Sequence, residues 1–142
     1  MVKTVNLHED LKGLTLLKNR GAHTTEEEAQ HSFTTLADFR DGGIFAAHFS
    51  GSSGWERHPK GDELVQILEG STRFDIIVDD QLQSLELSRG MLLVVPRNCW
   101  HRFDSEHGVK VMTATPTPTK HLHIDDPRME PPAQTDAETE SS

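Results

Sequence analysis

The sequence predicts a single all-β domain, either a sandwich or a barrel of short strands. Its length of 142 residues suits one domain and leaves no room for two separate cores. From residue 44 onward, short stretches alternate between apolar and polar residues, and turn-forming residues separate them at regular intervals. Many short strands spaced in this way are typical of sandwiches and barrels.

The strands follow one another closely along the middle of the chain. They are expected, in chain order, at residues 44–49, 63–68, 72–78, 82–87, 91–95, 100–103 and 109–113. Before them, Thr25 and Glu28 have the spacing of a capping box that opens a short helix. Phe33, Leu36 and Phe39 are expected to cover one edge of the sheet.

Composition and charge exclude several classes of function. Lys and Arg number 14 against 23 Asp and Glu, and an acidic chain without a basic cluster is a poor nucleic-acid binder. The longest apolar run, residues 91–95, is far shorter than the roughly 20 residues of a membrane span. The single Cys99 excludes an intramolecular disulfide and agrees with a reducing compartment. Since no secretory signal is visible either, we expect a cytoplasmic protein with no nucleic-acid or membrane partner.

The acidic residues concentrate at the end of the chain. Residues 127–142 carry three prolines and, after Met129, no large apolar side chain, so they are predicted to form a disordered acidic tail. A solvated tail is favoured over a binding arm. The expected organisation is therefore N-terminal strands and loops over residues 1–43, a barrel over 44–126 and the tail.

Two stretches carry the residues of a candidate metal site. Glu56 and His58 are two positions apart, so an extended strand directs both side chains to one face. The run Pro59–Asp62 can turn the chain and bring Glu63 back beside them. His101 follows in the second stretch, just after Pro96. Two imidazoles and two carboxylates that converge in a small barrel would form a nitrogen and oxygen site for a divalent ion.

The same two stretches resemble the two signature motifs of the cupin superfamily. The first motif ends in H-x(3,4)-E-x6-G, which His58, Glu63 and Gly70 match in full. The second motif, G-x5-P-x-G-x2-H-x3-N, is matched at Gly90, Pro96 and His101. Asn98 replaces its second glycine, and Ser105 replaces its asparagine. The resemblance covers roughly residues 45–115 and implies an antiparallel jelly-roll β-barrel that forms a homodimer.

The resemblance also implies a ligand set and a class of activity. The first metal-binding histidine of the family falls on Glu56, so the implied ligands are Glu56, His58, Glu63 and His101. They would hold one divalent Fe, Mn, Ni or Zn ion, which binds a small polar organic molecule. One of the carboxylates, Glu56 or Glu63, would leave the metal and move a proton. Dioxygenase, isomerase and lyase chemistry are not separated by these motifs.

Alternatives remain open beside this interpretation. A non-catalytic small-molecule-binding or sensory cupin without metal is the main one, and Glu56 and Glu63 could also act as an acid and base pair without metal. His48 could point inward with Ile44 and Ala46 and reach the same cavity, or be a hydrogen-bonded structural residue. Phe74 and Phe103 are expected in the barrel core or the pocket wall. His121 and His123 are interpreted as an incidental pair, and Cys99 as an unreactive thiol.

Overall fold

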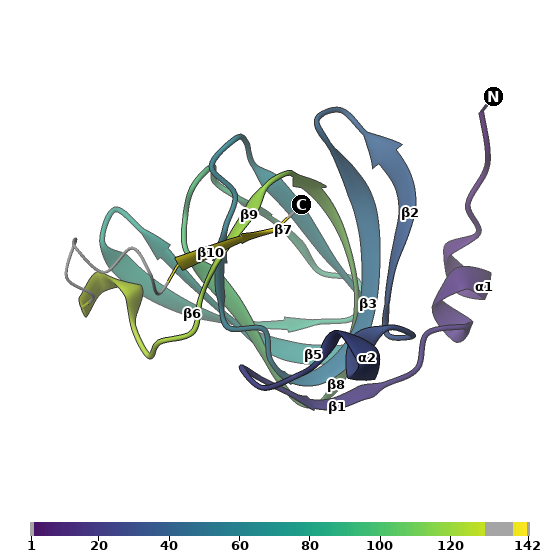
Figure 1. The fold of residues 1–142 in the computed structure, drawn as a ribbon, viewed down its shortest axis with the longest axis horizontal. Helices are drawn as coiled ribbons and strands as arrows, with labels where there is room; N and C mark the ends of the chain where they lie inside the picture. Colours follow the sequence, from purple (N-terminus) through teal and green to yellow (C-terminus); the bar gives the residue numbers. More distant parts are fainter. Residues whose placement is uncertain (1, 130–137, 142) are drawn as a thin grey trace.

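The computed structural model describes residues 2–129 and 138–141 and has the predicted all-β, antiparallel jelly-roll fold (Figure 1). In chain order the elements are α1 (Leu7–Lys12), β1 (Leu17–Arg20), α2 (Glu26–Ala29), β2 (Phe33–Phe39), β3 (Gly42–Ser52), β4 (Trp55–Arg57), β5 (Glu63–Val78), β6 (Gln81–Ser88), β7 (Leu92–Val95), β8 (His101–Pro116), β9 (Thr119–Leu122), the 3-10 turn η1 (Pro127–Met129) and β10 (Glu138–Ser141). Among the described residues, no helix is long and apolar enough to cross a membrane.

Two long strands, β5 and β8, connect the parts of the barrel. Each has 16 residues, and they pair with each other in antiparallel register. The first part of β5 also pairs with β7, and its second part pairs with β6. The change of partner coincides with a bulge at Gly70, whose φ of 76° is left-handed and where a Cβ atom would collide with the carbonyl of Gly108. The glycine that ends the first motif is therefore required by a close backbone contact.

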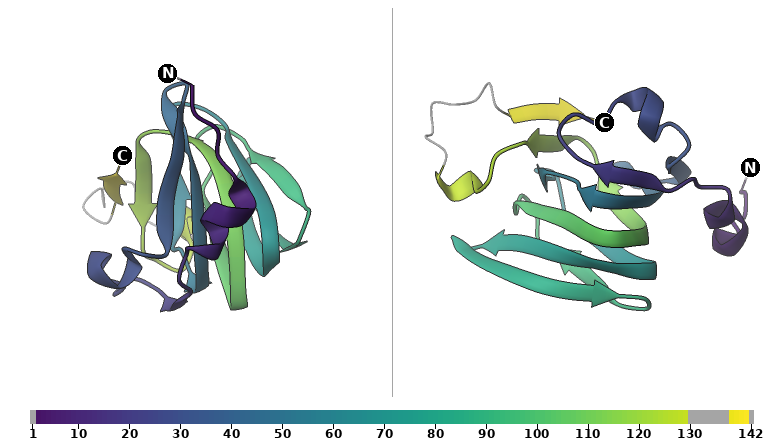
Figure 2. Two further views of the ribbon diagram at one scale, coloured as in Figure 1. Left: turned by 90° about the vertical axis from the view of Figure 1, so that its right-hand side faces the viewer. Right: turned by 90° about the horizontal axis from the view of Figure 1, so that it is seen from below.

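The N-terminal part of the chain adds strands and short helices to one edge of the barrel. Strands β1 and β2 both pair with β3, the first in parallel and the second in antiparallel register. The predicted capping box opens α2, and Asn6 caps α1, which was not predicted because its six residues show no long amphipathic pattern. Leu11 of α1 packs with Leu36 and Ala46 on the outer face of β2 and β3 (Figure 2, left).

The hydrophobic core lies between the two facing layers of strands. Its most buried members are Phe49, Val65, Ile67, Phe74 and Val109. Of the expected edge residues, Leu36 is buried under α1, Phe33 stacks on Phe49, and Phe39 is half exposed. Phe74 and Phe103, expected in the core or the pocket wall, are buried, whereas the edge residues of the first quarter of the chain are only partly covered.

The predicted acidic tail is described only in part. Residues 127–129 form η1, and β10 pairs with β9 in antiparallel register. Disorder therefore stays a prediction for residues 130–137 and 142, which lie outside the described residues.

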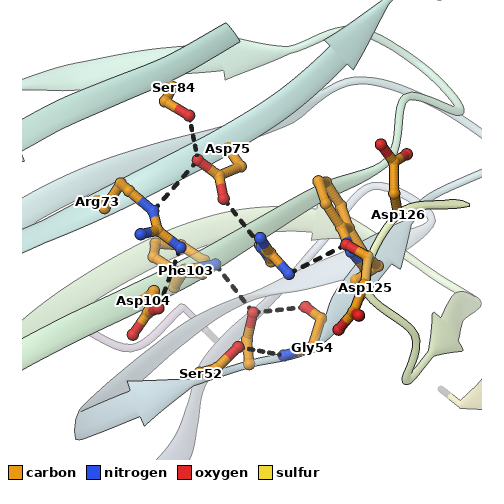
Figure 3. Close-up of polar contacts among 12 residues, drawn as sticks. Ser52, Gly54, Arg73, Asp75, Ser84, Phe103, Asp104, Asp125 and Asp126 are labelled. Atoms are coloured by element: carbon orange, nitrogen blue, oxygen red, sulfur yellow. Dashed lines mark hydrogen bonds and ion pairs between the residues drawn. The ribbon is translucent and has the colours of Figure 1, made fainter. Parts of the chain in front are cut away.

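A buried carboxylate, Asp75, connects several strands through hydrogen bonds and ion pairs (Figure 3). It accepts hydrogen bonds from Ser84 (2.6 Å) and from Arg102 Nε (2.9 Å). The Arg102 guanidinium lies 4.5 Å above the Trp55 ring, and Trp55 Nε1 donates to the carbonyl oxygen of Asp125 (3.1 Å). This network connects β5, β6, β8 and β4 to the segment that follows β9.

The charge of Asp75 should contribute to stability above acidic pH. Burial raises its pKa, but Ser84, Arg102 and Arg73 more than offset this and hold the pKa below its usual range. A carboxyl group whose pKa is lower in the folded state stabilises the fold above its unfolded pKa, about 3.9. That contribution is lost as the pH falls through the lower, folded pKa.

We therefore expect Asp75→Asn to lower the free energy of unfolding at pH 7 by about 2–3 kcal/mol, because charge-assisted hydrogen bonds are lost. Urea melts at pH 7 and pH 3 measure this, and the variant should lose less stability than the wild type on acidification. The matched control is Asp104→Asn, whose side chain is 42% exposed and should contribute less than about 1 kcal/mol. Equal losses in both variants would contradict this account.

Candidate metal centre and ligand cavity

Three of the four predicted ligands converge inside the barrel. His58 follows β4, Glu63 begins β5 and His101 begins β8, and all three side chains are buried. Their candidate ligand atoms lie within 4.8 Å of one another. Glu63 Oε1 is 3.2 Å from His58 Nε2 and 3.1 Å from His101 Nε2. The carboxylate oxygen and two ring nitrogens therefore face one point.

The two loops that carry the motifs are held against each other by backbone hydrogen bonds. Asn98 N–H donates to the carbonyl of His58 (3.0 Å), and Arg97 N–H donates to Asp62 Oδ1 (2.8 Å). Arg97 Nε also donates to the carbonyl of Pro59 (2.6 Å). Asn98 has a left-handed φ of 64°, which asparagine tolerates better than most residues. It can thus replace the motif's glycine without loss of the turn.

Each of the three buried side chains has an outer partner that fixes its orientation. His101 Nδ1 lies 3.0 Å from the carbonyl oxygen of Cys99, which can only accept, so Nδ1 carries the hydrogen and Nε2 faces Glu63. Thr115 Oγ1 donates to Glu63 Oε2 (2.6 Å), and Thr119 Oγ1 lies 3.0 Å from His58 Nδ1. Outer partners of this kind orient the ligands of protein metal sites.

The arrangement fits a divalent cation. Among the described residues, His58 Nε2 and Glu63 Oε1 are buried without an aligned hydrogen-bond partner, although they lie 3.2 Å apart. Burial raises the pKa of Glu63, but the two imidazoles more than offset this and hold it below its usual range. Burial lowers the pKa of His101, and Glu63 more than reverses that effect. The buried carboxylate therefore favours a positive charge here, which a metal ion would supply through two nitrogens and one oxygen.

Glu56, the fourth predicted ligand, lies beside this group but outside it. It stands directly opposite His101 across the β4–β8 pair and opposite His121 across the β4–β9 pair. Its Oε2 atom is 3.8 Å from His121 Nδ1, and its side chain is 16% exposed. Its negative charge contributes to raising the pKa of His101. The sequence analysis assigned His121 to an incidental pair. In the structure His121 contacts Glu56, which lies beside the candidate metal centre.

A cavity of about 430 Å³ opens beside the centre, a size typical of small-molecule sites. Its lining includes Glu56, His58 and Glu63. The remaining wall is made of apolar and aromatic residues, of hydroxyl groups and of one cation: Phe33, Phe45, Ala46, Ala47, Phe49, Phe103, Val111, Thr34, Thr35, Thr113, Thr115, Thr117, Thr119 and Arg20.

The predicted pocket residues have three different positions. Phe103 lines the cavity. Phe74 is fully buried behind it, with its ring centroid 5.0 Å from that of Phe103 and 5.6 Å from that of His101. His48 is not among the residues that line the cavity, and its Nδ1 lies 3.3 Å from the carbonyl oxygen of Leu14, so its place in the substrate pocket stays a prediction. Ala46, two positions before it, lines the cavity and also packs against Leu11 of α1.

Sequence reasoning missed the threonines and Arg20. The alternation of threonine in residues 113–119 was a usable signal, since residues two apart share one face of a strand. Arg20 gave no such signal, because it lies in the N-terminal stretch of strands and loops, for which no individual strand was located.

Comparisons with known proteins agree with this fold. The profile of the cupin domain family matches residues 45–115, half of the chain. Acireductone dioxygenase from two strains of Rhodopseudomonas palustris is 43% identical over 49 residues, which cover 34% of this chain. That match spans only 29% of the length of the dioxygenase.

Two solved structures share the architecture at low sequence identity. A cupin-2 domain protein from Shewanella frigidimarina has a TM-score of 0.56 and 21% identity, over 80% of this chain and 94% of that one. Hydroquinone 1,2-dioxygenase from Sphingomonas sp. TTNP3 has a TM-score of 0.51 and 17% identity, over 60% and 65% of the two chains. The family match, the two motifs and the shared jelly roll lead to one conclusion: this protein belongs to the cupin family.

Proposed function

We propose that this cupin holds one divalent Fe, Mn, Ni or Zn ion and acts on a small organic molecule in the adjoining cavity. The observation that carries the proposal is the buried, unaligned pair His58 Nε2 and Glu63 Oε1, which converges with His101. His58 and Glu63 also line the cavity. Dioxygenase chemistry is favoured among the reaction types, because the 49-residue match is to acireductone dioxygenase.

The side chains have distinct parts in this proposal. A bound ion would polarise an oxygen atom of the substrate. Glu63 is fixed by Thr115 and kept ionised, so it acts as a permanent ligand with His58 and His101. Glu56 is less buried than Glu63. Among the described residues its only ion pair is the 3.8 Å contact to His121. Glu56 is therefore the carboxylate that moves a proton to or from the bound substrate, and the role of fourth ligand is the alternative.

A metal-free binding protein is the second candidate function. Glu63 raises the pKa of His101, so a proton shared by these two groups would neutralise the buried charge without a metal. The homodimer and the cytoplasmic location stay predictions, and light scattering on the purified protein tests the first.

Metal binding should depend on the three converging side chains and on their outer partners. We expect His101→Ala and Glu63→Gln to lose the ion, and Thr115→Val to weaken metal affinity about 10–100-fold, because Glu63 loses its hydroxyl partner. Elemental analysis and chelator competition on untagged protein measure both effects. His48→Ala is the control, since that ring lies outside the cavity lining and should leave binding unchanged. Metal that persists in His101→Ala would refute the assignment.

Turnover should require both the ion and the carboxylate of Glu56. Fe(II)-loaded protein is expected to consume oxygen with at least one member of a panel of enediols and dihydroxybenzenes, which offer two adjacent oxygen donors. Glu56→Gln should lower that rate about a hundredfold or more, the usual contribution of a positioned acid or base, while the metal content stays unchanged.

Loss of metal in Glu56→Gln would instead identify Glu56 as the fourth ligand. A stoichiometric metal content without oxygen consumption or conversion of any panel member would argue against the dioxygenase and favour a binding protein.

A further inference from the structure

Arg20, the last residue of β1, places a cation in the cavity wall. Its guanidinium carbon lies 4.8 Å from the ring centroid of Phe33 and 4.7 Å from that of Phe49. The side chain is half-buried, and its guanidinium lies over both rings in cation–π contact. Contacts of this kind do not use the N–H groups as hydrogen-bond donors.

Those N–H groups have no protein partner among the described residues, because no side-chain hydrogen bond or ion pair of Arg20 is found there. Arg102 and Arg73, by contrast, are both paired with Asp75. Burial lowers the pKa of Arg20. The negative charge of Glu56 opposes this in part, although among the described residues the two side chains form no ion pair. A guanidinium has five donors, and leaving them without acceptors in a partly apolar site costs free energy. An acceptor supplied by a ligand would recover it.

The backbone around Arg20 is shaped to direct it to this place. The β1–β3 pairing is irregular between Leu17 and Arg20, and Asn19 has a left-handed φ of 56°. Asn19 N–H donates to Ser50 Oγ (3.0 Å). Gly51, opposite Arg20, has a φ of 90°, and a Cβ atom there would collide with the backbone nitrogen and oxygen of Arg20. The position of Arg20 thus depends on a bulge and on a glycine that admits its backbone.

A chain of contacting aromatic rings runs from Arg20 to His101. Phe49 contacts Phe103 edge-on, with centroids 5.8 Å apart. Phe103 contacts Phe74, and Phe74 stacks on His101. The cavity lining thus combines the oxygen and nitrogen ligands Glu63 and His58, apolar and aromatic side chains, and the cation of Arg20. A ligand that uses all three has an oxygen donor, an apolar body and an anionic group.

We propose that Arg20 binds the carboxylate of the substrate, so that the substrate class is small organic acids with an apolar body. The planar guanidinium matches a carboxylate in a bidentate geometry, which gives both affinity and orientation. The assignment rests on the proposed function for the metal end of the cavity, but the binding of the carboxylate by Arg20 is testable without metal.

The test compares phenylacetate with its uncharged isostere phenylacetamide, using calorimetry on chelator-treated protein. We expect the wild type to bind phenylacetate about tenfold or more tightly, because the amide lacks the charge-assisted contact. Arg20→Met should remove this preference while it retains binding of the amide, and Arg20→Lys should keep part of it. Arg40→Met is the matched control, since Arg40 lies over the Phe39 ring at 5.5 Å on the exposed surface and should leave the preference unchanged.

Equal binding of the two probes by the wild type, no binding of either, or a preference that survives in Arg20→Met would overturn the proposal. If Arg20→Met does not fold, the Nε–H resonance of Arg20 in the wild type decides, since it should shift with phenylacetate and not with phenylacetamide. A separate metal titration distinguishes a failure of the proposed metal site from a failure of the proposed role of Arg20. A carboxylate preference without metal binding refutes the metal site alone, and metal binding without the preference refutes the role of Arg20 alone.

Discussion

The buried carboxylate of Glu63 is the constraint on which the rest of the site depends. An ionised carboxylate away from water is unfavourable unless positive charge and hydrogen-bond donors compensate it. Here the compensation comes from His58, His101 and Thr115, which are contributed by the end of β4, the start of β8 and its far end. A divalent ion held by the same atoms would compensate the charge of Glu63 more fully than a single proton.

The fold brings these groups together through a few backbone features. The bulge at Gly70 lets β5 serve two neighbours, and the left-handed Asn98 joins the second motif to the carbonyl of His58. On the far side, the bulge at Asn19 and the bare Cα of Gly51 place Arg20 in the cavity wall. These glycine and asparagine residues adopt the left-handed backbone conformations that place the titratable side chains in the cavity. Both ends of the cavity depend on such positions.

The sequence predicts the strands and the three converging side chains of the candidate metal centre because both leave local signals. Strand alternation has a period of two, and His58, Glu63 and His101 stand at motif spacings. Other features depend on contacts between distant residues. His48 lies beside the carbonyl of Leu14, Glu56 contacts His121 across the β4–β9 pair, and Arg20 reaches the cavity wall at an irregularity in the β1–β3 pairing. No local pattern encodes these three outcomes, since each depends on tertiary structure.

The central claim is that one divalent ion is bound by His58, Glu63 and His101. X-ray absorption at the metal edge of protein loaded with one equivalent of Co(II) tests it most directly, because the spectrum reports the donor atoms and the number of imidazoles. The account predicts nitrogen and oxygen donors only, with two imidazoles, in the wild type, and no protein-bound Co(II) in His101→Ala. A spectrum without imidazole, or one that His101→Ala leaves unchanged, would contradict it.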